Sequence, residues 1–278
     1  MPRGKGRWPA FVPLVLVVLV VWLLPAGCGK KAISQDEAMD SLRSAYRMMA
    51  ESTGYRYRTT IKYDFPDMDE AQKTQIAATI PSYLTLEGEV QQQGGNYRQH
   101  SITGGMGEPT ESYVVDGVSY QNTAGSGWVK TNLASYRLNL NNLYSFSSED
   151  FENMLGFVGE INVVEDSPEK LVLSFNAGGD YLLSSLEKNK DTYRTEEELK
   201  KYDQLYQLMV NSSTEITSSI YKDSGYLQRQ EITMTLPDTP LIGTTVVMSF
   251  KIDFYDYSAD IQIQLPEEAS KAKSATAN

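Results

Sequence analysis

Cys28 and His100 are the residues best suited to covalent and acid–base chemistry in this chain, and each is the single residue of its type. Cys28 follows an apolar run, residues 11–24, and the small residues Ala26 and Gly27, while three basic residues and no acidic ones precede the run. Basic, apolar and small residues in this order are typical of a secretory signal peptide. The run is also shorter than the roughly 20 apolar residues that cross a bilayer as a helix. We therefore expect residues 1–27 to be a signal peptide.

The residues around Cys28 resemble the lipobox of bacterial lipoproteins. The matching stretch is Leu24-Pro25-Ala26-Gly27-Cys28, with a proline where the family usually has an aliphatic residue. The resemblance implies that Cys28 becomes a diacylglyceryl cysteine and the first residue after cleavage, with palmitate or similar acyl chains as a membrane anchor and residues 28–34 as a lipidated tether. Because each buried methylene contributes about 0.8 kcal/mol, two or three chains hold a protein firmly where one holds it marginally. The alternatives are an uncleaved transmembrane helix with an incidental cysteine and a free structural thiol.

The charge of the chain excludes one class of partner. Lysine and arginine number 25 and aspartate and glutamate 36, so the formal net charge is −11, and it becomes −14 once residues 1–27 and their three basic residues are removed. Phosphate backbones bind to basic surfaces, so we expect no nucleic-acid partner. With Cys28 acylated, no disulfide can form within the chain, and the fold must rest on its hydrophobic core.

The remaining polar residues do not form a catalytic pattern. A Ser-His-Asp triad could use no histidine other than His100, which we expect to be an ordinary exposed side chain in a strand. The acidic run Glu196-Glu197-Glu198 suits a helix N-terminus, and the acidic stretch at residues 67–70 lacks the glycine and the glutamate of a calcium loop. The sequence predicts no enzyme, no metal site and no cofactor.

Hydrophobic periodicity predicts one helix followed by many strands. Ser34 and Glu37 have the spacing of a capping box before a helical apolar stripe. From Tyr55 to Phe65, mainly aromatic residues alternate with mainly charged ones. The dipeptide Asp116-Gly117 suits a two-residue hairpin turn that places Val115 opposite Val118 and Tyr113 opposite Tyr120. Further strands are expected at 83–92, 96–102, 128–131, 161–166, 171–175, 214–222, 226–236, 246–254 and 261–265.

Helices are expected between some of these strands. Residues 67–80, 181–186 and a segment opened by the capping box Thr195-Glu198 have helical patterns. Another helical interval begins near Ser147 and carries Phe151, Met154, Leu155 and Val158 on one side, which could be ordinary core or the wall of a ligand cavity. We expect one domain over residues 35–266 and a disordered polar tail over residues 267–278.

This arrangement predicts an α+β fold: a curved antiparallel sheet, or half-barrel, with an N-terminal helix and helical insertions packed on its concave face. It resembles the LolA, LppX and LprG-like bacterial lipoproteins, including uncharacterised Gram-positive ones, over nearly the whole mature chain. The stretches that carry the resemblance are the first helix with the strand from Tyr55, then residues 111–120 before Gly-Trp-Val-Lys at 127–130, 221–227 and 263–269.

The resemblance implies a cavity for acyl chains lined by strand faces and insertion helices. We expect the lining to include Tyr57, Ile61, Phe151, Met154, Leu155, Val158, Met248 and Phe250. The leading hypothesis is an extracytoplasmic lipoprotein, anchored to the cell membrane of a Gram-positive-type envelope, that binds a lipid or other apolar ligand without catalysis. The alternative is a protein-interaction or regulatory lipoprotein, in envelope sensing or spore germination, with a filled cavity. A cavity of roughly 300 Å³ or more would favour the ligand.

Overall fold

The computed structural model describes most of the chain beyond the predicted signal peptide. The described residues are 33–77, 79–93, 96–105, 107–123, 127–132, 154–188, 190–239 and 243–274. From Gln35 onward they belong to one compact unit. Cys28, the signal peptide and Phe151 lie outside the described residues. No helix among the described residues is long and apolar enough to span a membrane.

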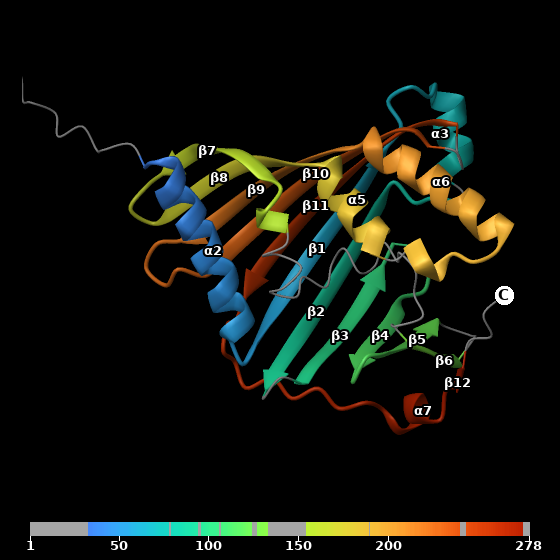
Figure 1. Cartoon of the computed structure of the whole chain (residues 1–278). Helices are drawn as coiled ribbons and strands as arrows, with labels where there is room; N and C mark the ends of the chain where they lie inside the picture. The colour runs from blue at the N-terminus through green and yellow to red at the C-terminus, as the bar shows by residue number, and fades with distance from the viewer. Residues whose placement is uncertain are drawn as a thin grey trace, which may run out of the picture. The chain divides into compact units, whose positions relative to one another are not determined.

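A single sheet of twelve strands dominates this unit, in the order β12-β6-β5-β4-β3-β2-β1-β11-β10-β9-β8-β7. All neighbours are antiparallel except β12 and β6, which are parallel. The strands are β1 (Gly54–Asp64), β2 (Tyr83–Gln93), β3 (Asn96–Gly104), β4 (Thr110–Val115), β5 (Val118–Thr123), β6 (Gly127–Asn132), β7 (Val158–Asp166), β8 (Lys170–Gly178), β9 (Ser213–Tyr221), β10 (Leu227–Thr239), β11 (Thr244–Tyr255) and β12 (Lys273–Ser274). The sheet is curved and does not close, so the predicted fold class is confirmed (Figure 1).

One helix precedes the first strand, and the other described helices lie in connections between strands. The helices are α2 (Gln35–Glu51), α3 (Glu70–Ala77), α5 (Gly179–Lys188), the 3₁₀ helix η3 (Lys190–Thr192), α6 (Glu196–Val210) and α7 (Glu267–Ser270). In Figure 1, α2, α5 and α6 lie over the same side of the sheet. By contrast, α3 joins β1 to β2. All residues of α3 are described, and none of these residues is buried.

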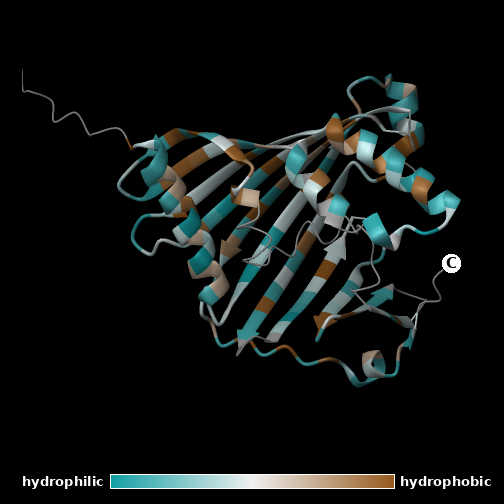
Figure 2. Ribbon diagram, viewed as in Figure 1, coloured by the Kyte–Doolittle hydropathy of each residue, from teal (hydrophilic) through white to brown (hydrophobic). Residues whose placement is uncertain are grey.

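Alternation along the strands separates two faces of the sheet, which we call the inner face, covered by α2, and the outer face. In β1 the inner-face residues Tyr55, Tyr57, Thr59 and Ile61 are all buried, as the period of two predicted. Their partners in β11 continue the same face, where Tyr57 pairs with Phe254 and Ile61 with Phe250. Figure 2 shows hydrophobic and hydrophilic residues alternating along these strands.

The β4–β5 hairpin has the predicted register. Val115 pairs with Val118 and Tyr113 with Tyr120. Asp116 and Gly117 both have positive φ, 52° and 76°, which a turn of this type requires and which glycine and aspartate tolerate. The predicted capping box of α6 is also present, because the Thr195 side chain accepts from the Glu198 amide and the Glu198 carboxylate accepts from the Thr195 amide.

The predicted last strand at residues 261–265 is wrong. These residues belong to what we call the C-terminal segment (residues 256–266), which lies extended across the outer face outside the sheet. Ile261 and Ile263 are buried against Tyr113, while Ile263 bonds through its backbone to the side chains of Gln91 and Arg98. An extended segment on a flat surface also buries every second residue, so its pattern matches that of a strand.

The polar tail also differs from its prediction as a disordered segment. Residues 267–270 form α7, and residues 273–274 form β12, which pairs with β6. Ala269 and Ala272 are buried there. Their small side chains provide contacts that the polar composition of the tail did not indicate.

Candidate functional site

The inner face beneath α2 is the region where the predicted ligand cavity should lie. The apolar stripe of α2 is buried there, and it consists of Ala38, Leu42, Ala45, Tyr46 and Met49. This stripe has a polar centre, because the Gln230 side-chain amide on β10 donates to the Tyr46 hydroxyl over 2.5 Å, and the Ser218 hydroxyl lies 3.5 Å from the same oxygen. Gln230 and Ser218 are both 0% exposed. The helix therefore meets the sheet through a buried polar contact inside an apolar interface.

This polar contact is not fully satisfied. The Gln230 side-chain oxygen is buried without a hydrogen-bond partner among the described residues. Leaving a buried acceptor unpaired costs about 1–3 kcal/mol, which weakens the association of α2 with the sheet. Burial also raises the pKa of Tyr46 above its ordinary value, so its hydroxyl stays protonated.

The start of α2 is tied to the edge strand β7. The Gln35 side chain donates to the Ile161 carbonyl over 2.6 Å and accepts from the Ile161 amide over 2.8 Å, as a neighbouring strand would. The pairing of β7 with β8 shifts register on both sides, between Val158 and Ile161 and between Val163 and Glu165. Such irregularities are typical of sheet edges and discourage pairing with another chain.

An enclosed cavity lies between the end of α2 and the strands, and it is small. Its volume is about 10 Å³, and its lining consists of Met49, Tyr55, Tyr57, Thr59, Val90, Tyr97, Ile252 and Phe254. That space corresponds to about one water molecule, whereas pockets for drug-sized ligands measure roughly 300–1,000 Å³. Met49 is the α2 residue of this lining; the other seven residues come from β1, β2, β3 and β11.

Tyr57 is held in place by a hydrogen bond and by close packing. The Gln99 side-chain amide donates to its hydroxyl over 2.5 Å. Its ring covers Gly88 of β2, where a Cβ atom would lie only 2.5 Å from the ring. Burial raises the pKa of Tyr57 to about 12, so its hydroxyl remains neutral and acts as a hydrogen-bonding group.

The structure brings together only part of the predicted lining. Tyr57, Ile61, Met248 and Phe250 are buried on the inner face, on the adjacent strands β1 and β11. Met154 and Leu155 are also buried, in a helical stretch that ends one turn before β7. Val158 begins β7, which the strand order separates from β1 by four strands.

Of the predicted residues that are described, Tyr57 alone borders the enclosed cavity. The sequence carried a signal for some of the missed residues. Tyr55 and Thr59 share the alternation of Tyr57, and Met49 belongs to the apolar stripe of the first helix. Tyr97 had no comparable signal, because its position depends on how β3 pairs with β2.

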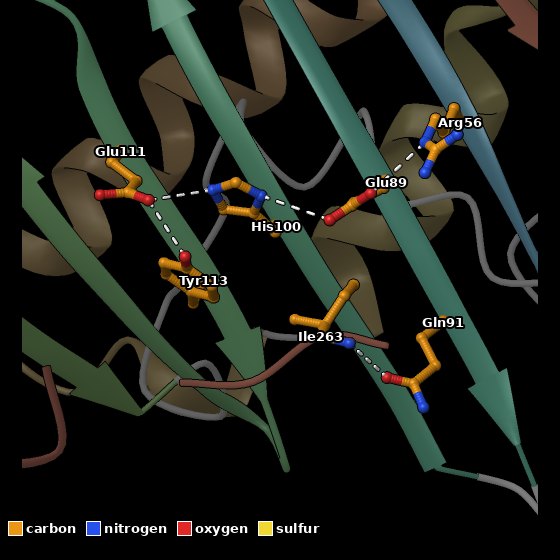
Figure 3. A network of polar contacts seen from close by, with 7 residues as sticks. All are labelled: Arg56, Glu89, Gln91, His100, Glu111, Tyr113 and Ile263. Carbon is orange, nitrogen blue, oxygen red and sulfur yellow. Dashed lines mark hydrogen bonds and ion pairs between the residues drawn. The ribbon is translucent and has the colours of Figure 1, made fainter. Parts of the chain in front are cut away.

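A second group of polar residues lies on the outer face, as Figure 3 shows. His100 on β3 lies between two carboxylates: its Nε2 is 3.1 Å from Glu111 Oε1, and its Nδ1 is 3.6 Å from Glu89 Oε1. The Tyr113 hydroxyl donates to the same Glu111 oxygen, and its ring stacks on His100 at 4.5 Å. The prediction that His100 is an ordinary exposed side chain is wrong, because its side chain is 22% exposed.

The outer-face group has a structural explanation. Tyr113 also packs against Ile261, Ile263 and Trp128, so the cluster supports the C-terminal segment. Burial, followed by the hydrogen bond to Glu111, raises the pKa of Tyr113 to about 12. Among the described residues, no group of three or more histidine, cysteine, aspartate or glutamate side chains could hold a metal ion.

Comparisons with known proteins add little to this account. No family model matches the sequence, and no curated protein matches it. A solved DUF1329 family protein from Desulfovibrio piger is 10% identical, with a TM-score of 0.30, over 83% of this chain and 95% of that chain. A solved LolA superfamily protein from Nitrosomonas europaea is 9% identical, with a TM-score of 0.29, over 83% of this chain and 95% of that chain. The fold class therefore rests on the topology of the sheet itself.

Proposed function

We propose that the chain is a membrane-anchored extracytoplasmic protein that binds a lipid or another apolar ligand, without catalysis, on the inner face beneath α2. The observation that carries this proposal is the construction of the enclosed cavity. Its floor consists of strand residues that are apolar or aromatic except for Thr59, and Met49 of a single amphipathic helix contributes its roof. Movement of one helix would therefore open an apolar surface.

The small volume of the cavity means that a ligand must displace α2. About 10 Å³ holds no acyl chain, so the described conformation corresponds to a closed state. The contact of Tyr46 with Gln230 makes displacement easier, because the buried Gln230 oxygen without a partner would gain a hydrogen bond on opening. The ligand would replace the apolar contacts that α2 loses.

The predicted anchor is consistent with this arrangement. The tether, residues 28–34, ends where α2 begins at Gln35. A helix joined to an acylated cysteine by so short a tether would lie near the membrane surface, where a lipid ligand enters or leaves. The anchoring part of the proposal is tested by Cys28→Ser, which should release the folded protein from membranes. If the variant stayed membrane-bound after a high-salt wash, the anchor would be ruled out.

A second function is favoured by the same small cavity. An inner face filled by its own side chains suits a protein-interaction or regulatory module, as in envelope sensing or spore germination. In that case α2 is a permanent part of the core and the protein has no apolar ligand.

Ligand binding distinguishes the two functions. A soluble form beginning at Gly29 would be freed of lipid by extraction, then examined by native mass spectrometry with and without added fatty acids and phospholipids. The first function predicts bound lipid or renewed acyl-chain uptake, whereas neither would be found if the second function is correct.

A pair of variants tests whether α2 controls uptake. The double variant Tyr46→Phe/Gln230→Leu removes both polar partners, which should hold α2 more tightly and slow the uptake. Gln204→Leu, on the exposed side of α6, is the matched control and should leave uptake unchanged. Equal uptake rates in all three proteins would place the ligand elsewhere.

A further inference from the structure

A second pocket, away from the α2 interface, is formed by α5, η3 and α6. We call it the tyrosine pocket, and its lining consists of Glu187, Lys190, Tyr202, Asp203 and Tyr206. Its volume of about 410 Å³ falls within the range of roughly 300–1,000 Å³ that is typical of ligand pockets. It is open to solvent, so a small ligand needs no rearrangement of the helices to reach it.

The aromatic wall of the tyrosine pocket consists of rings that pack against one another. Tyr202 and Tyr206 are four residues apart on α6 and therefore share one side of the helix, with ring centroids 6.2 Å apart. Tyr193 packs edge-on against Tyr202 at 5.3 Å, and Leu186, which is 0% exposed, belongs to the same cluster. The capping box at the start of α6 fixes the helix that carries both rings.

The Lys190 ammonium group already contacts the aromatic wall. Lys190 Nζ lies 5.5 Å from the centroid of the Tyr202 ring, within the roughly 6 Å of a cation–π contact. Neither Glu187 nor Asp203 forms an ion pair with any residue in the described part of the chain. Within the described part of the chain, the pocket thus presents two carboxylates without an ion pair and one lysine, and this charge balance favours a further cation or a replacement for the lysine.

We propose that the tyrosine pocket binds an organic ammonium cation of the trimethylammonium class, with Lys190 as the internal group that the ligand displaces. Aromatic faces beside carboxylates recognise such cations because the ring quadrupole attracts a weakly hydrated charge. Hard metal ions instead require a set of oxygen ligands, and no metal-binding group was found among the described residues. This site does not rest on the proposed function, because its residues are not those that line the cavity beneath α2.

The first experiment titrates choline chloride into the soluble form and measures heat of binding. The wild type should bind saturably, and Lys190→Ala should bind roughly threefold more tightly because the competing ammonium has been removed. Lys200→Ala makes the same change of charge on α6, outside the tyrosine pocket, and should bind as the wild type does. The proposal is overturned if neither the wild type nor Lys190→Ala binds choline, or if the two lysine variants bind it equally.

The second experiment tests the ring and the charge separately. Tyr206→Ala should weaken choline binding roughly threefold to tenfold, while Tyr83→Ala, which removes an exposed tyrosine elsewhere, should have no effect. Tyr202→Phe keeps the aromatic face and the fold, so it should bind choline nearly as well as the wild type. The neutral isostere 3,3-dimethylbutan-1-ol should not compete with choline, and competition at equal concentration would contradict a cation site.

The source of the cation is distinguished by vesicles. Phosphatidylcholine vesicles and phosphatidylglycerol vesicles are compared for binding to the soluble form and to Tyr206→Ala. If the protein binds phosphatidylcholine vesicles and Tyr206→Ala weakens this binding, the ligand is a lipid headgroup. If the protein binds choline but no vesicles, the ligand is a free ammonium compound. Both outcomes support the site. If the protein bound vesicles and neither the Tyr206→Ala substitution nor added choline weakened this binding, the result would count against the site.

Discussion

The inner and outer faces of the sheet come from the same strands but are stabilised in different ways. On β1, the inner residues Tyr57 and Ile61 are buried among apolar neighbours, whereas the outer residues Arg56 and Arg58 form ion pairs with Glu89 and Glu87 of β2. Exposed ion pairs contribute little, while buried side chains each contribute several times as much. The difference indicates that stability depends mainly on the inner face, which is also where we propose that the ligand binds, and that the outer face mainly supports the C-terminal segment.

Truncation of the α2 stripe should show the largest difference between the faces. Leu42 is 0% exposed, so Leu42→Ala should lower the free energy of unfolding by about 2–5 kcal/mol. Ile102 on the outer face is 45% exposed, so Ile102→Ala should change it by less than about 0.5 kcal/mol. Urea unfolding measures both values, and similar losses would show that α2 is not part of the folded core.

High pH should act on the inner face. Tyr57 keeps its proton up to about pH 12 in the folded chain, against an ordinary value of 10.0, because burial disfavours the charged form. Its contribution is therefore fully present below pH 10 and is lost as pH rises towards 12, by about 2–3 kcal/mol at 1.36 kcal/mol per pH unit.

Urea unfolding at pH 9, 10.5 and 11.5 measures this loss. Tyr57→Phe should make the free energy of unfolding depend less steeply on pH than in the wild type. Part of the dependence should remain, because burial also raises the pKa of other tyrosines, Tyr46 and Tyr55 among them. An unchanged slope in Tyr57→Phe would mean that Tyr57 is accessible to hydroxide in the folded state.

A single methyl group on β2 should disturb the inner face. The Cβ atom of Gly88→Ala would lie 2.5 Å from the Tyr57 ring, which forces the ring to move and should cost about 1–3 kcal/mol. Gly159→Ala is the matched control, because its Cβ atom would meet nothing within 4 Å. Tm values of the two variants test the difference, and Tyr57→Leu should restore part of the stability of Gly88→Ala.

The smallest effect is expected at the outer-face cluster. His100→Ala removes the ring stacked on Tyr113 and should cost about 0.5–1.5 kcal/mol. His100→Phe keeps the stacking and should recover most of this loss. Limited proteolysis of the C-terminal segment provides the local measurement, and equal cleavage of both variants would show that the stacked ring does not support this segment.

The sequence predicted those parts of the fold that depend on local patterns. Alternation located β1 and β11, the Asp116-Gly117 turn set the β4–β5 register, and Thr195 with Glu198 located the start of α6. Features that depend on long-range pairing were missed. The C-terminal segment has the same period of two as a strand, and His100 is half-buried because of side chains on two neighbouring strands.

The candidate site was harder to predict than the fold. Tyr57 was predicted as a lining residue, whereas Met49 was predicted only as part of the apolar stripe of the first helix. Gln230 occupies an apolar position in the alternation of β10, and only its partner Tyr46 on α2 explains it. The small volume of the cavity could not be predicted either, because it depends on how closely α2 packs on the sheet.

The central claim, that α2 is a displaceable cover over an apolar surface, is tested most directly by thiol labelling. In the soluble form, which lacks Cys28, Met49→Cys introduces a thiol that should be as buried as Met49, which is 4% exposed. Ser44→Cys, on the exposed side of α2, is the control that labels at once. We predict slow labelling of Met49→Cys alone and a clear acceleration when fatty acid or phospholipid is added. Labelling of Met49→Cys that is slow and unaffected by every lipid, while Ser44→Cys reacts fully, would contradict the claim.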